Sequence, residues 1–409
     1  MTMAGELHTG AQGTTSTRGH ATISDRAVAD RWRPFADLEA DLELLSAVGR
    51  GRSLERSGGS DFTSNDYLGL AQSIELFEAL GDALQRRVPV GAGGSRLLRG
   101  NHPEHEALEE SAAAYFGAES ALYFATGFAA NMTLFATAPQ RGDLVVYDEW
   151  IHASVHDGLA RTRAQTAAAR HNDAQAIDDA IVGWRESGGV GRVWIAVESL
   201  YSMDGDRPDL AELDSLATRR EAVLVIDEAH ATGALGPGGR GLGAFLEGRE
   251  NVVTLHTCGK ALGTAGALVC GPRVLKDFLV NRGRAFIFST APSPLVAAVT
   301  RTAIALCERS DARREELRWR VDCAMRALSR YCGLRGSDSH VVPIVVGEDA
   351  AALELAARLR VRGFDVRAIR PPTVPVGTAR LRVALTLNVS EGTVESLFQT
   401  LGAEMAARR

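Results

Sequence analysis

Lys260 is one of only two lysines in a chain that otherwise uses arginine for its basic residues, and the other is Lys276. It lies in a stretch with no other charged residue, Thr257-Cys258-Gly259-Lys260-Ala261-Leu262-Gly263. Arginine can replace lysine in a surface ion pair but not as a nucleophile, because the guanidinium group stays protonated. A lysine amine with a lowered pKa can attack a carbonyl carbon and form a Schiff base. Lys260 is therefore a candidate for covalent chemistry, and the alternative is an ordinary surface lysine.

A carboxylate and a histidine follow an apolar run elsewhere in the chain. Val223–Ile226 is rich in β-branched residues, Asp227 follows it directly, and His230 comes three residues later. A carboxylate at a strand end can hold a cation, a metal ion or a protonated ring nitrogen, or it can simply cap the next turn. A metal site would need further ligands at tight spacing, and none is nearby, so we expect no metal.

Three other segments carry groups that could bind a ligand, although each is a weak signal alone. His152 follows the apolar run Leu144–Tyr147. Gly127 and Phe128 begin a helical stretch after a short apolar run, and such a helix start offers free backbone N–H groups to a phosphate. Ser202 lies among hydroxyls and acids after another apolar run, in what would by itself be an ordinary polar loop.

The elements that must position these groups predict an α/β fold. Apolar runs at 144–147, 193–197 and 223–226 have strand length, and each is followed by a turn and usually a helix. This pattern is typical of strands buried on both faces of a mostly parallel sheet flanked by helices. Helices are also expected over Glu104–Phe116 and Phe128–Ala138, with a strand at 121–124 between them. Ligands bind at the carboxyl ends of such strands, so the candidate groups would meet at one sheet edge.

The two ends of the chain predict smaller parts. Residues 27–48 resemble an amphipathic helix, and Ser293–Ser329 has one long helical pattern. After it, strands at 341–346, 366–369 and 381–385 alternate with helices at 350–362 and 394–407, as in a small α+β domain. We therefore expect a disordered tail over 1–24, an N-terminal arm over 25–65, a large domain over 66–292, and a connecting helix with a small C-terminal domain over 293–409.

Composition limits the partners and the location. The net charge is −6 and no long basic run occurs, which argues against nucleic-acid binding. No apolar run reaches the roughly 18 residues that a membrane span needs. The five cysteines are scattered, odd in number and without CxxC spacing, so we expect reduced thiols in the cytoplasm.

The candidate groups together suit one kind of cofactor, a phosphorylated pyridine aldehyde. Lys260 would join the aldehyde carbon, and Asp227 would keep the ring nitrogen protonated so that the ring accepts electrons. The helix start at Gly127 and the hydroxyl of Thr257 would hold the phosphate, while a histidine stacks on the ring face.

Two longer motifs resemble those of a known family, the α-oxoamine synthases, which are pyridoxal 5′-phosphate (PLP) enzymes of fold type I. These are Phe62–Leu70 and the glycine-rich segment Gly91–His102. The stretches at 126–131, 152–154, 202–206, 227–236 and 257–263 follow in the family's order, so the resemblance covers about residues 60–400. Within the family, the segment from Ala368 to Arg382 is most similar to the 8-amino-7-oxononanoate synthases, which join L-alanine to a pimeloyl thioester in biotin synthesis.

The resemblance implies a role for each candidate residue. Lys260 would bind PLP covalently and remove the substrate α-proton, Asp227 would pair with the ring nitrogen, and His152 would stack on the ring and assist acyl transfer. His230 and Ser202 would hydrogen-bond the phenolic oxygen of the ring. The other implied contacts are Gly127, Phe128 and Thr257 to the cofactor, Asn65, Arg370 and Thr373 to the substrate, and Ser289 and Thr290 to the phosphate across a dimer interface.

The resemblance also implies a PLP-dependent acyltransferase that acts as a homodimer with a shared active site. Its substrates would be an amino acid, L-alanine first, and an acyl thioester on coenzyme A or on a carrier protein. The alternatives are a sister synthase that uses glycine, serine or another acyl group, an aminotransferase or aldolase of the same fold type, and an inactive partner subunit. The substrate-contacting arginine of the family's N-terminal arm would be Arg50 or Arg52.

Overall fold

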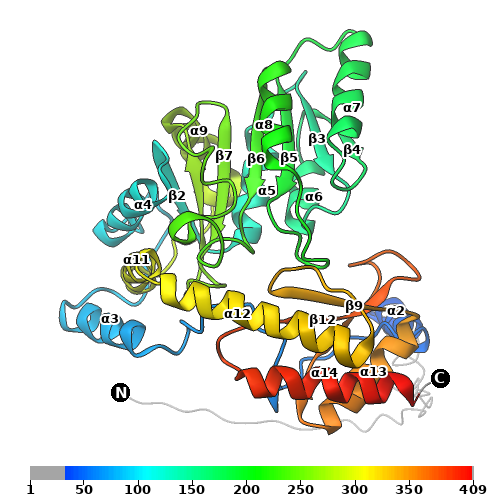
Figure 1. Ribbon diagram of the computed structural model, residues 1–409. Coiled ribbons are helices and arrows are strands. Elements are labelled where there is room, and N and C mark those ends of the chain that lie inside the picture. Colours follow the sequence, from blue (N-terminus) through cyan, green and yellow to red (C-terminus); the bar gives the residue numbers. More distant parts are fainter. Residues whose placement is uncertain (1–32, 408–409) are drawn as a thin grey trace, which may run out of the picture. The chain divides into compact units, whose positions relative to one another are not determined.

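A computed structural model describes residues 33–407, and the chain divides into two compact units between Leu54 and Glu55 (Figure 1). In the first unit, helix α2 (Ala36–Ala47) has no buried residue. The predicted helix over 27–48 is therefore confirmed for 36–47. Residues 27–32, like the predicted tail over 1–24, lie outside the described residues. The second unit contains all the elements described below.

A seven-stranded sheet forms the centre of the second unit, in the order β2-β8-β7-β6-β5-β3-β4. Strands β4, β3, β5, β6 and β7 run parallel, and β8 is antiparallel to both of its neighbours. The strands are β2 (Ser120–Phe124), β3 (Leu144–Asp148), β4 (Gln165–Ala169), β5 (Val193–Glu198), β6 (Ala222–Asp227), β7 (Val252–Thr257) and β8 (Ala267–Gly271). The predicted mostly parallel sheet is confirmed, and the four strands predicted for it lie within β2, β3, β5 and β6.

The sequence pattern missed strand β7, because polar residues interrupt its apolar run. Thr254 and His256 are nevertheless buried, since each has a polar partner. Thr254 Oγ1 donates to Glu247 Oε1 at 2.6 Å, and His256 Nδ1 lies 2.8 Å from Thr232 Oγ1. Buried polar groups with partners are tolerated inside a sheet, so a buried strand does not need an uninterrupted apolar run.

Helices cover both faces of this sheet (Figure 1). One face packs against α5 (Gly127–Thr137), α6 (Ala153–Leu159), α9 (Arg273–Arg282) and α10 (Arg284–Ile287), and its core includes Leu134 and Val155. The other face packs against α7 (Ala174–Glu186) and α8 (Leu210–Arg219) through Ile181 and Leu213. Both faces of the central strands are therefore buried, which accounts for their apolar sequences.

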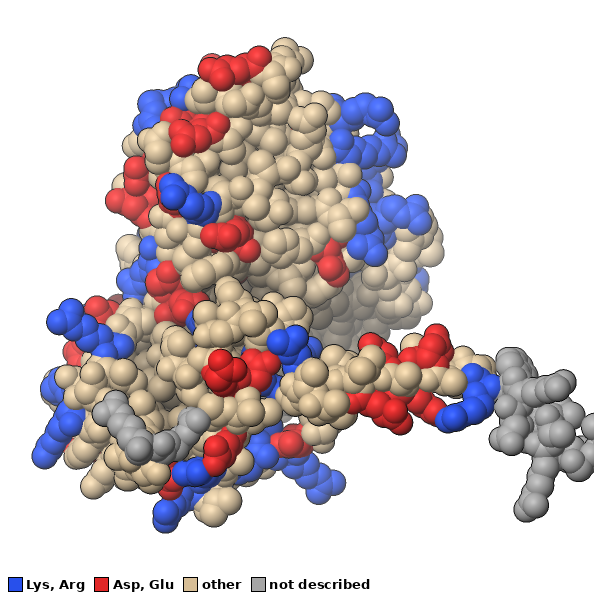
Figure 2. Space-filling view, turned by 90° about the vertical axis from the view of Figure 1, so that its right-hand side faces the viewer, with Lys and Arg blue, Asp and Glu red and all other residues tan. Residues whose placement is uncertain are grey.

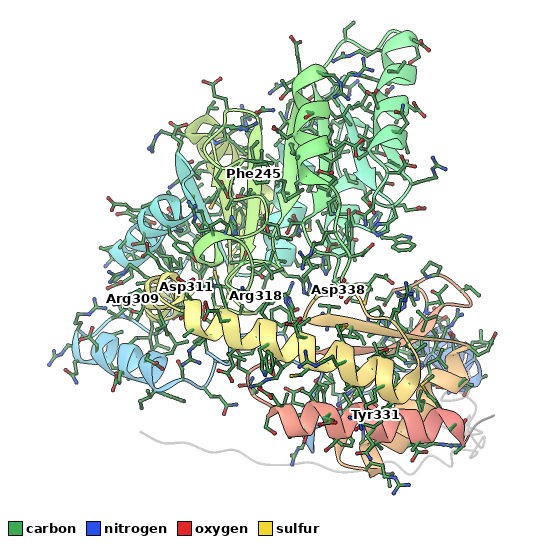
Figure 3. All side chains as sticks on the ribbon, viewed as in Figure 1. Phe245, Arg309, Asp311, Arg318, Tyr331 and Asp338 are labelled. Atoms are coloured by element: carbon green, nitrogen blue, oxygen red, sulfur yellow. The ribbon has the colours of Figure 1, made fainter. Side chains whose placement is uncertain are left out.

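The long helical pattern over Ser293–Ser329 was predicted as one helix, and this prediction is wrong. The structure has two helices, α11 (Pro294–Glu308) and α12 (Asp311–Ala327), and Figure 3 shows Arg309 and Asp311 at the break between them. Arg314 stabilises the break, because its guanidinium group donates to Cys307 O at 2.7 Å and to Asp311 Oδ1 at 2.6 Å. Hydrophobic periodicity continues through the break, so the pattern alone did not reveal it.

Two further helices precede the large sheet in the chain, α3 (Ile74–Gln85) and α4 (Pro103–Phe116), and α4 confirms the helix predicted from Glu104. Beyond α12, the chain makes a short π-helical turn, Leu328–Cys332. The three-stranded antiparallel sheet that follows has the order β11 (Arg367–Ile369), β12 (Ala379–Ala384) and β9 (Val341–Gly347). Its core is closed by α12, α13 (Asp349–Val361) and α14 (Glu391–Ala406). The predicted alternation of strands and helices in the C-terminal part is confirmed.

Residues near the start of the second unit join this C-terminal part. Strand β1 (Ser60–Asp61) pairs in parallel with β10 (Phe364–Asp365). The predicted domain boundaries at 65 and 292 remain predictions, since the residues after Leu54 form one compact unit.

Within residues 33–407, no helix is both long and apolar enough to cross a bilayer. On the face that Figure 2 shows, acidic and basic side chains are interspersed over the lower part, and basic side chains gather at one upper edge.

Candidate active site

A cavity of about 370 Å³ lies at the carboxyl ends of the parallel strands, and Lys260 is in its wall. The structure brings to this cavity most of the residues that were predicted to bind a cofactor, namely Gly127, Phe128, His152, Asp227, His230, Thr257 and Lys260. These residues come from the start of α5, the loop before α6, the end of β6 and the turn between β7 and β8. The prediction that the candidate groups lie together at one sheet edge is confirmed for these seven residues.

Lys260 lies in the turn that joins β7 to β8. The turn is closed by backbone hydrogen bonds, from Cys258 N to Gly266 O at 2.8 Å and from Thr264 N to Cys258 O at 2.9 Å. Burial lowers the pKa of Lys260 from 10.5 to about 8, although the nearby charges of Asp227 and Glu198 act in the opposite direction. A larger fraction of the amine is therefore neutral and nucleophilic near neutral pH than in an ordinary lysine.

His230 connects Lys260 to the segment around Tyr67. Its Nε2 lies 2.9 Å from Lys260 Nζ, and its Nδ1 lies 2.6 Å from the Tyr67 hydroxyl, which donates to Asn65 Oδ1 at 2.9 Å. Since the hydroxyl has only one proton, His230 donates through Nδ1 to Tyr67 and accepts through Nε2 from Lys260. Burial, with the charges of Lys260 and Arg382, lowers the pKa of His230 well below its usual value, so this imidazole is neutral.

Asp227 ends β6 and is almost fully buried, with 6% of its surface exposed. Two groups donate to its carboxylate, Asn131 Nδ2 at 2.7 Å and the backbone N–H of Ala229 at 2.9 Å. A buried carboxylate held in this way, next to Lys260 and His152, is suited to hold a protonated ring nitrogen. Asn131 belongs to the stretch 126–131, but no role was predicted for it. Its contact with Asp227 joins residues far apart in the chain, which a local sequence pattern does not reveal.

His152 begins α6 and faces the same cavity. Its Nδ1 accepts from the backbone N–H of Ser154 at 3.2 Å and lies 2.7 Å from the Ser154 hydroxyl, which fixes the ring orientation. Burial lowers the pKa of His152, so the ring is uncharged near neutral pH. A neutral imidazole held in this way can lie flat against an aromatic ligand.

Glu198 is a second buried carboxyl group in the cavity wall, and no role was predicted for it. It ends β5 in register with Asp227, the last residue of β6. Burial and the charge of Asp227 raise its pKa well above the usual value, which favours the protonated acid. Within residues 33–407, its Oε1 has no hydrogen-bond partner. The one sequence signal for a functional role of Glu198 was its position at the end of an apolar run. A single acid followed by a polar loop is usually structural, so this signal was too weak.

The start of α5 forms a cradle for an anion. Thr126 caps the helix by accepting from Ala129 N at 3.0 Å. Gly127 and Phe128 line the cavity, and their N–H groups, the first of the helix, have no intrahelical partner. A Cβ atom at Gly127 would lie 2.8 Å from Thr257 Cγ2, so the cradle has room for a small residue only. Helix starts of this type bind phosphate. The residues of the cavity thus fit a phosphorylated pyridine aldehyde: an amine, a buried anion, a flat neutral ring and a phosphate cradle.

Several predicted residues do not line this cavity. The backbone carbonyl of Ser202 accepts from Arg382 Nε at 2.6 Å, and Ser202 lies outside the cavity wall. Ser289 and Thr290 are exposed beyond α10. Arg370 and Thr373 share a turn after β11, where Thr373 N donates to Arg370 O at 3.1 Å. Their contacts to substrate or cofactor, and those of Asn65, remain predictions.

The loops that carry His152 and Ser202 are held together by His171. Its Nδ1 lies 2.8 Å from Asp148 Oδ1, at the end of β3, and its Nε2 lies 2.7 Å from Asp206 Oδ2. Burial lowers the pKa of His171, but the hydrogen bonds and charges of both aspartates outweigh this effect and raise it to about 9. His171 is therefore a cation at neutral pH, and Trp150 stacks on its ring at a centroid distance of 4.0 Å.

Comparisons with known proteins agree with this geometry. Residues 58–401 match the family described as aminotransferase class I and II. The chain is 40% identical to an 8-amino-7-oxononanoate synthase from Saccharophagus degradans, over 84% of this chain and 86% of the relative. It is also 40% identical to one from Anaeromyxobacter dehalogenans, over 89% and 94% of the two chains. Among solved structures, a lysine-to-alanine variant of a serine palmitoyltransferase from S. paucimobilis with a bound PLP–myriocin aldimine superposes with a TM-score of 0.80 at 26% identity, covering 91% of this chain and 98% of that one.

Proposed function

The chain belongs to the aminotransferase class I and II family, and from this premise we propose that it is a PLP-dependent acyltransferase that makes 8-amino-7-oxononanoate. Its substrates are L-alanine and a pimeloyl thioester, and its other products are carbon dioxide and the free thiol carrier. The 40% identity over most of the chain to relatives that bear this enzyme's name supports the reaction. The observation that carries the proposal is the convergence of Lys260, Asp227 and a phosphate cradle on one cavity.

The residues of the cavity supply binding and proton transfer, and PLP, when bound, supplies an electron-withdrawing ring that stabilises negative charge at the substrate α-carbon. Lys260 would hold the cofactor at its aldehyde carbon. Its free amine can also act as a base, because its pKa of about 8 leaves part of it neutral near neutral pH. Asp227 would hold the ring nitrogen of the cofactor, and its carboxylate is kept in place by two hydrogen-bond donors.

The two histidines have different tasks in this proposal. His152, neutral and fixed by Ser154, would stack on one face of the cofactor ring and assist the transfer of the acyl group. His230 accepts from Lys260 and is held by Tyr67, so it orients the amine toward the cavity. Orientation of this kind lowers the activation barrier, since the reacting groups no longer have to be ordered at each turnover.

We propose in addition that the enzyme is a cytoplasmic homodimer. Ser289 and Thr290 lie on an exposed segment after α10 and are suited to reach the phosphate of a second copy. Exposed apolar side chains nearby in the chain and in the glycine-rich segment support an interface, with Phe288 72% and Leu98 82% exposed. Five cysteines without a disulfide suit a reducing compartment. Sedimentation analysis of the purified protein measures the oligomeric state directly.

The release of free thiol from pimeloyl-CoA tests the reaction class. We expect release that depends on L-alanine and that is absent in Lys260→Ala, even though the variant still binds PLP in the cradle. An aminotransferase would consume an amino acid and an oxo acid without releasing thiol. The fold similarity to serine palmitoyltransferase makes serine the first alternative amino acid, so serine and glycine are assayed in parallel. Thiol release in Lys260→Ala at the wild-type rate would contradict the assignment of Lys260.

A further inference from the structure

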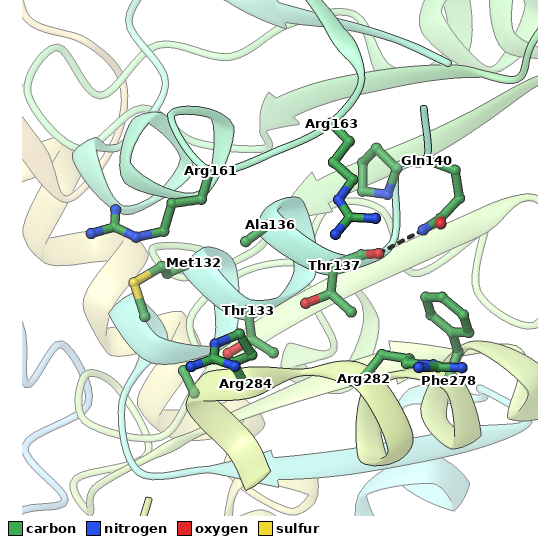
Figure 4. Close-up of a pocket in the computed structure, with 12 residues that line it drawn as sticks. Met132, Thr133, Ala136, Thr137, Gln140, Arg161, Arg163, Phe278, Arg282 and Arg284 are labelled. Carbon is green, nitrogen blue, oxygen red and sulfur yellow. Dashed lines mark hydrogen bonds between the residues drawn. The ribbon is translucent and has the colours of Figure 1, made fainter. Parts of the chain in front are cut away.

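A second and larger cavity, of about 660 Å³, lies beside α5, and four arginines line it (Figure 4). Arg161 and Arg163 lie in the loop after α6, Arg282 ends α9 and Arg284 begins α10. The other residues of the wall are uncharged, among them Met132 of α5. The wall therefore contains positive charge from two segments of the chain, 161–163 and 282–284, and no carboxylate.

The charge of these arginines is not balanced by nearby acids. Within residues 33–407, no ion pair joins Arg161, Arg163, Arg282 or Arg284 to a carboxylate, whereas arginines elsewhere, such as Arg220 with Asp178 at 2.6 Å, are paired. Four like charges around one cavity repel each other, so an anion in the cavity is favoured. The planar guanidinium group matches phosphate oxygens in two-pronged hydrogen bonds.

The cavity has polar groups in place for such a ligand. Figure 4 shows the guanidinium groups of Arg163 and Arg284 turned toward the α5 side chains Thr137 and Thr133. The arginines are held only by weak contacts, since Arg161 donates to the carbonyl of Asp157 at 3.2 Å and Arg284 lies over the ring of Phe288 at 5.0 Å. Their side chains can therefore close around an anion without breaking an ion pair.

Two helices connect this cavity to the Lys260 cavity. Phe128 lines the first cavity and Met132 the second, and these residues are one turn of α5 apart, about 6 Å along the helix axis. The two ends of α6 make the same connection. His152, just before α6, lines the first cavity, and Arg161, just after it, lines the second. The two cavities are therefore neighbours along α5 and α6, which places the arginines within reach of an extended ligand whose reacting end is at Lys260.

We propose that the arginine cavity binds the phosphate groups of the phosphopantetheine carrier of the acyl thioester. This inference rests on the proposed function, because such a thioester has its sulfur and its phosphates at opposite ends of a flexible pantetheine arm. Two sources share this chemistry. Coenzyme A carries a diphosphate and a 3′-phosphate beyond the arm, and a carrier protein holds the arm through one phosphodiester.

The test compares thioesters with and without phosphate in a double variant, Arg163→Gln with Arg284→Gln. Arg318→Gln is the matched control, since Arg318 is exposed on α12, outside the walls of both cavities, and carries no ion pair with a described residue (Figure 3). Hydrogen bonds to charged groups contribute enough that we expect the KM for pimeloyl-CoA to rise about tenfold in the double variant. The KM for pimeloyl-pantetheine, which has no phosphate, and kcat for both substrates are expected to stay unchanged.

A binding measurement separates this inference from the proposed function. Adenosine 3′,5′-bisphosphate is titrated calorimetrically into PLP-loaded wild-type protein, the double variant and Arg318→Gln, and no turnover is needed. We expect binding that weakens with salt and is lost only in the double variant. If no thioester gives product, the proposed function fails, and the calorimetry still reports on the cavity.

A KM increase for pimeloyl-CoA identifies coenzyme A as the source of the phosphates, and an increase only for the pimeloyl thioester of a carrier protein identifies the carrier protein. A KM that is unchanged for both of these thioesters overturns the proposal. Bisphosphate binding that is equal in wild type and double variant also overturns it. An equal KM increase for pimeloyl-pantetheine also overturns it, because the arginines would then act on the acyl part or on the fold.

Discussion

Replacement of His171 by glutamine should destabilise the protein in a pH-dependent way. The imidazole bridges Asp148 and Asp206 at 2.8 and 2.7 Å, and its pKa is raised from 6.5 to about 9. One pKa unit corresponds to about 1.4 kcal/mol, so the full shift corresponds to about 3 kcal/mol. Asp206 is 40% exposed, and solvent screens its part, so we expect about 2 kcal/mol.

The direction of the pH dependence follows from the raised pKa. Because folded His171 holds its proton more tightly than unfolded His171, its contribution is fully present below pH 6.5 and is lost as the pH rises through about 9. The variant His171→Gln should therefore unfold at a clearly lower urea concentration than wild type at pH 6. At pH 10 the two proteins should differ by only about 1 kcal/mol, the contribution of neutral hydrogen bonds.

Urea unfolding of the PLP-loaded proteins at pH 6, 8 and 10 measures this effect. His156→Gln is the control, because His156 is exposed and has no carboxylate partner among the described residues. A difference between wild type and His171→Gln that is the same at pH 6 and pH 10 would refute the reasoning, since it would mean that the charge of His171 contributes nothing to the bridge.

Three further predictions concern the Lys260 cavity. Gly127→Ala should weaken PLP binding about tenfold or more in a titration of the cofactor-free protein, because the added methyl group would lie 2.8 Å from Thr257 Cγ2. The control variant Gly183→Ala should leave PLP binding unchanged, since its methyl group meets nothing within 4 Å. Asp227→Asn should keep PLP bound but lower the rate of thiol release about 100- to 1000-fold, as expected when one partner of a buried charge pair is removed, and a near-normal rate would exclude the pairing role. The rate of PLP incorporation into the cofactor-free protein should increase with pH around a midpoint of about 8, where Lys260 becomes neutral, and a pH-independent rate would contradict the lowered pKa.

The sequence predicted the residues whose chemistry is rare and whose position follows from strand order. Lys260 was conspicuous because arginine replaces lysine almost everywhere else, and Asp227 because it ends an apolar strand. Parallel strands bring their carboxyl ends to one edge, so the meeting of these residues with His152 and Gly127 followed from topology alone.

The residues that the sequence did not reveal depend on contacts between distant segments. The bond from Asn131 to Asp227 spans 96 positions and the one between Tyr67 and His230 spans 163, and no local pattern encodes such pairs. Strand β7 was missed because Thr254 and His256 have buried polar partners. The break between α11 and α12 was missed because Arg314 reaches back to Cys307 across it, a contact that hydrophobic periodicity does not reflect.

The mass of the product tests the central claim most directly. The PLP-loaded protein is incubated with pimeloyl-CoA and L-alanine, with glycine and serine in parallel, and the products are identified by mass spectrometry. The account predicts a product of the mass of 8-amino-7-oxononanoate from alanine, with loss of carbon dioxide, and little or no product from the other two amino acids. An amino acid that is consumed with no acylated product and no thiol released would contradict it.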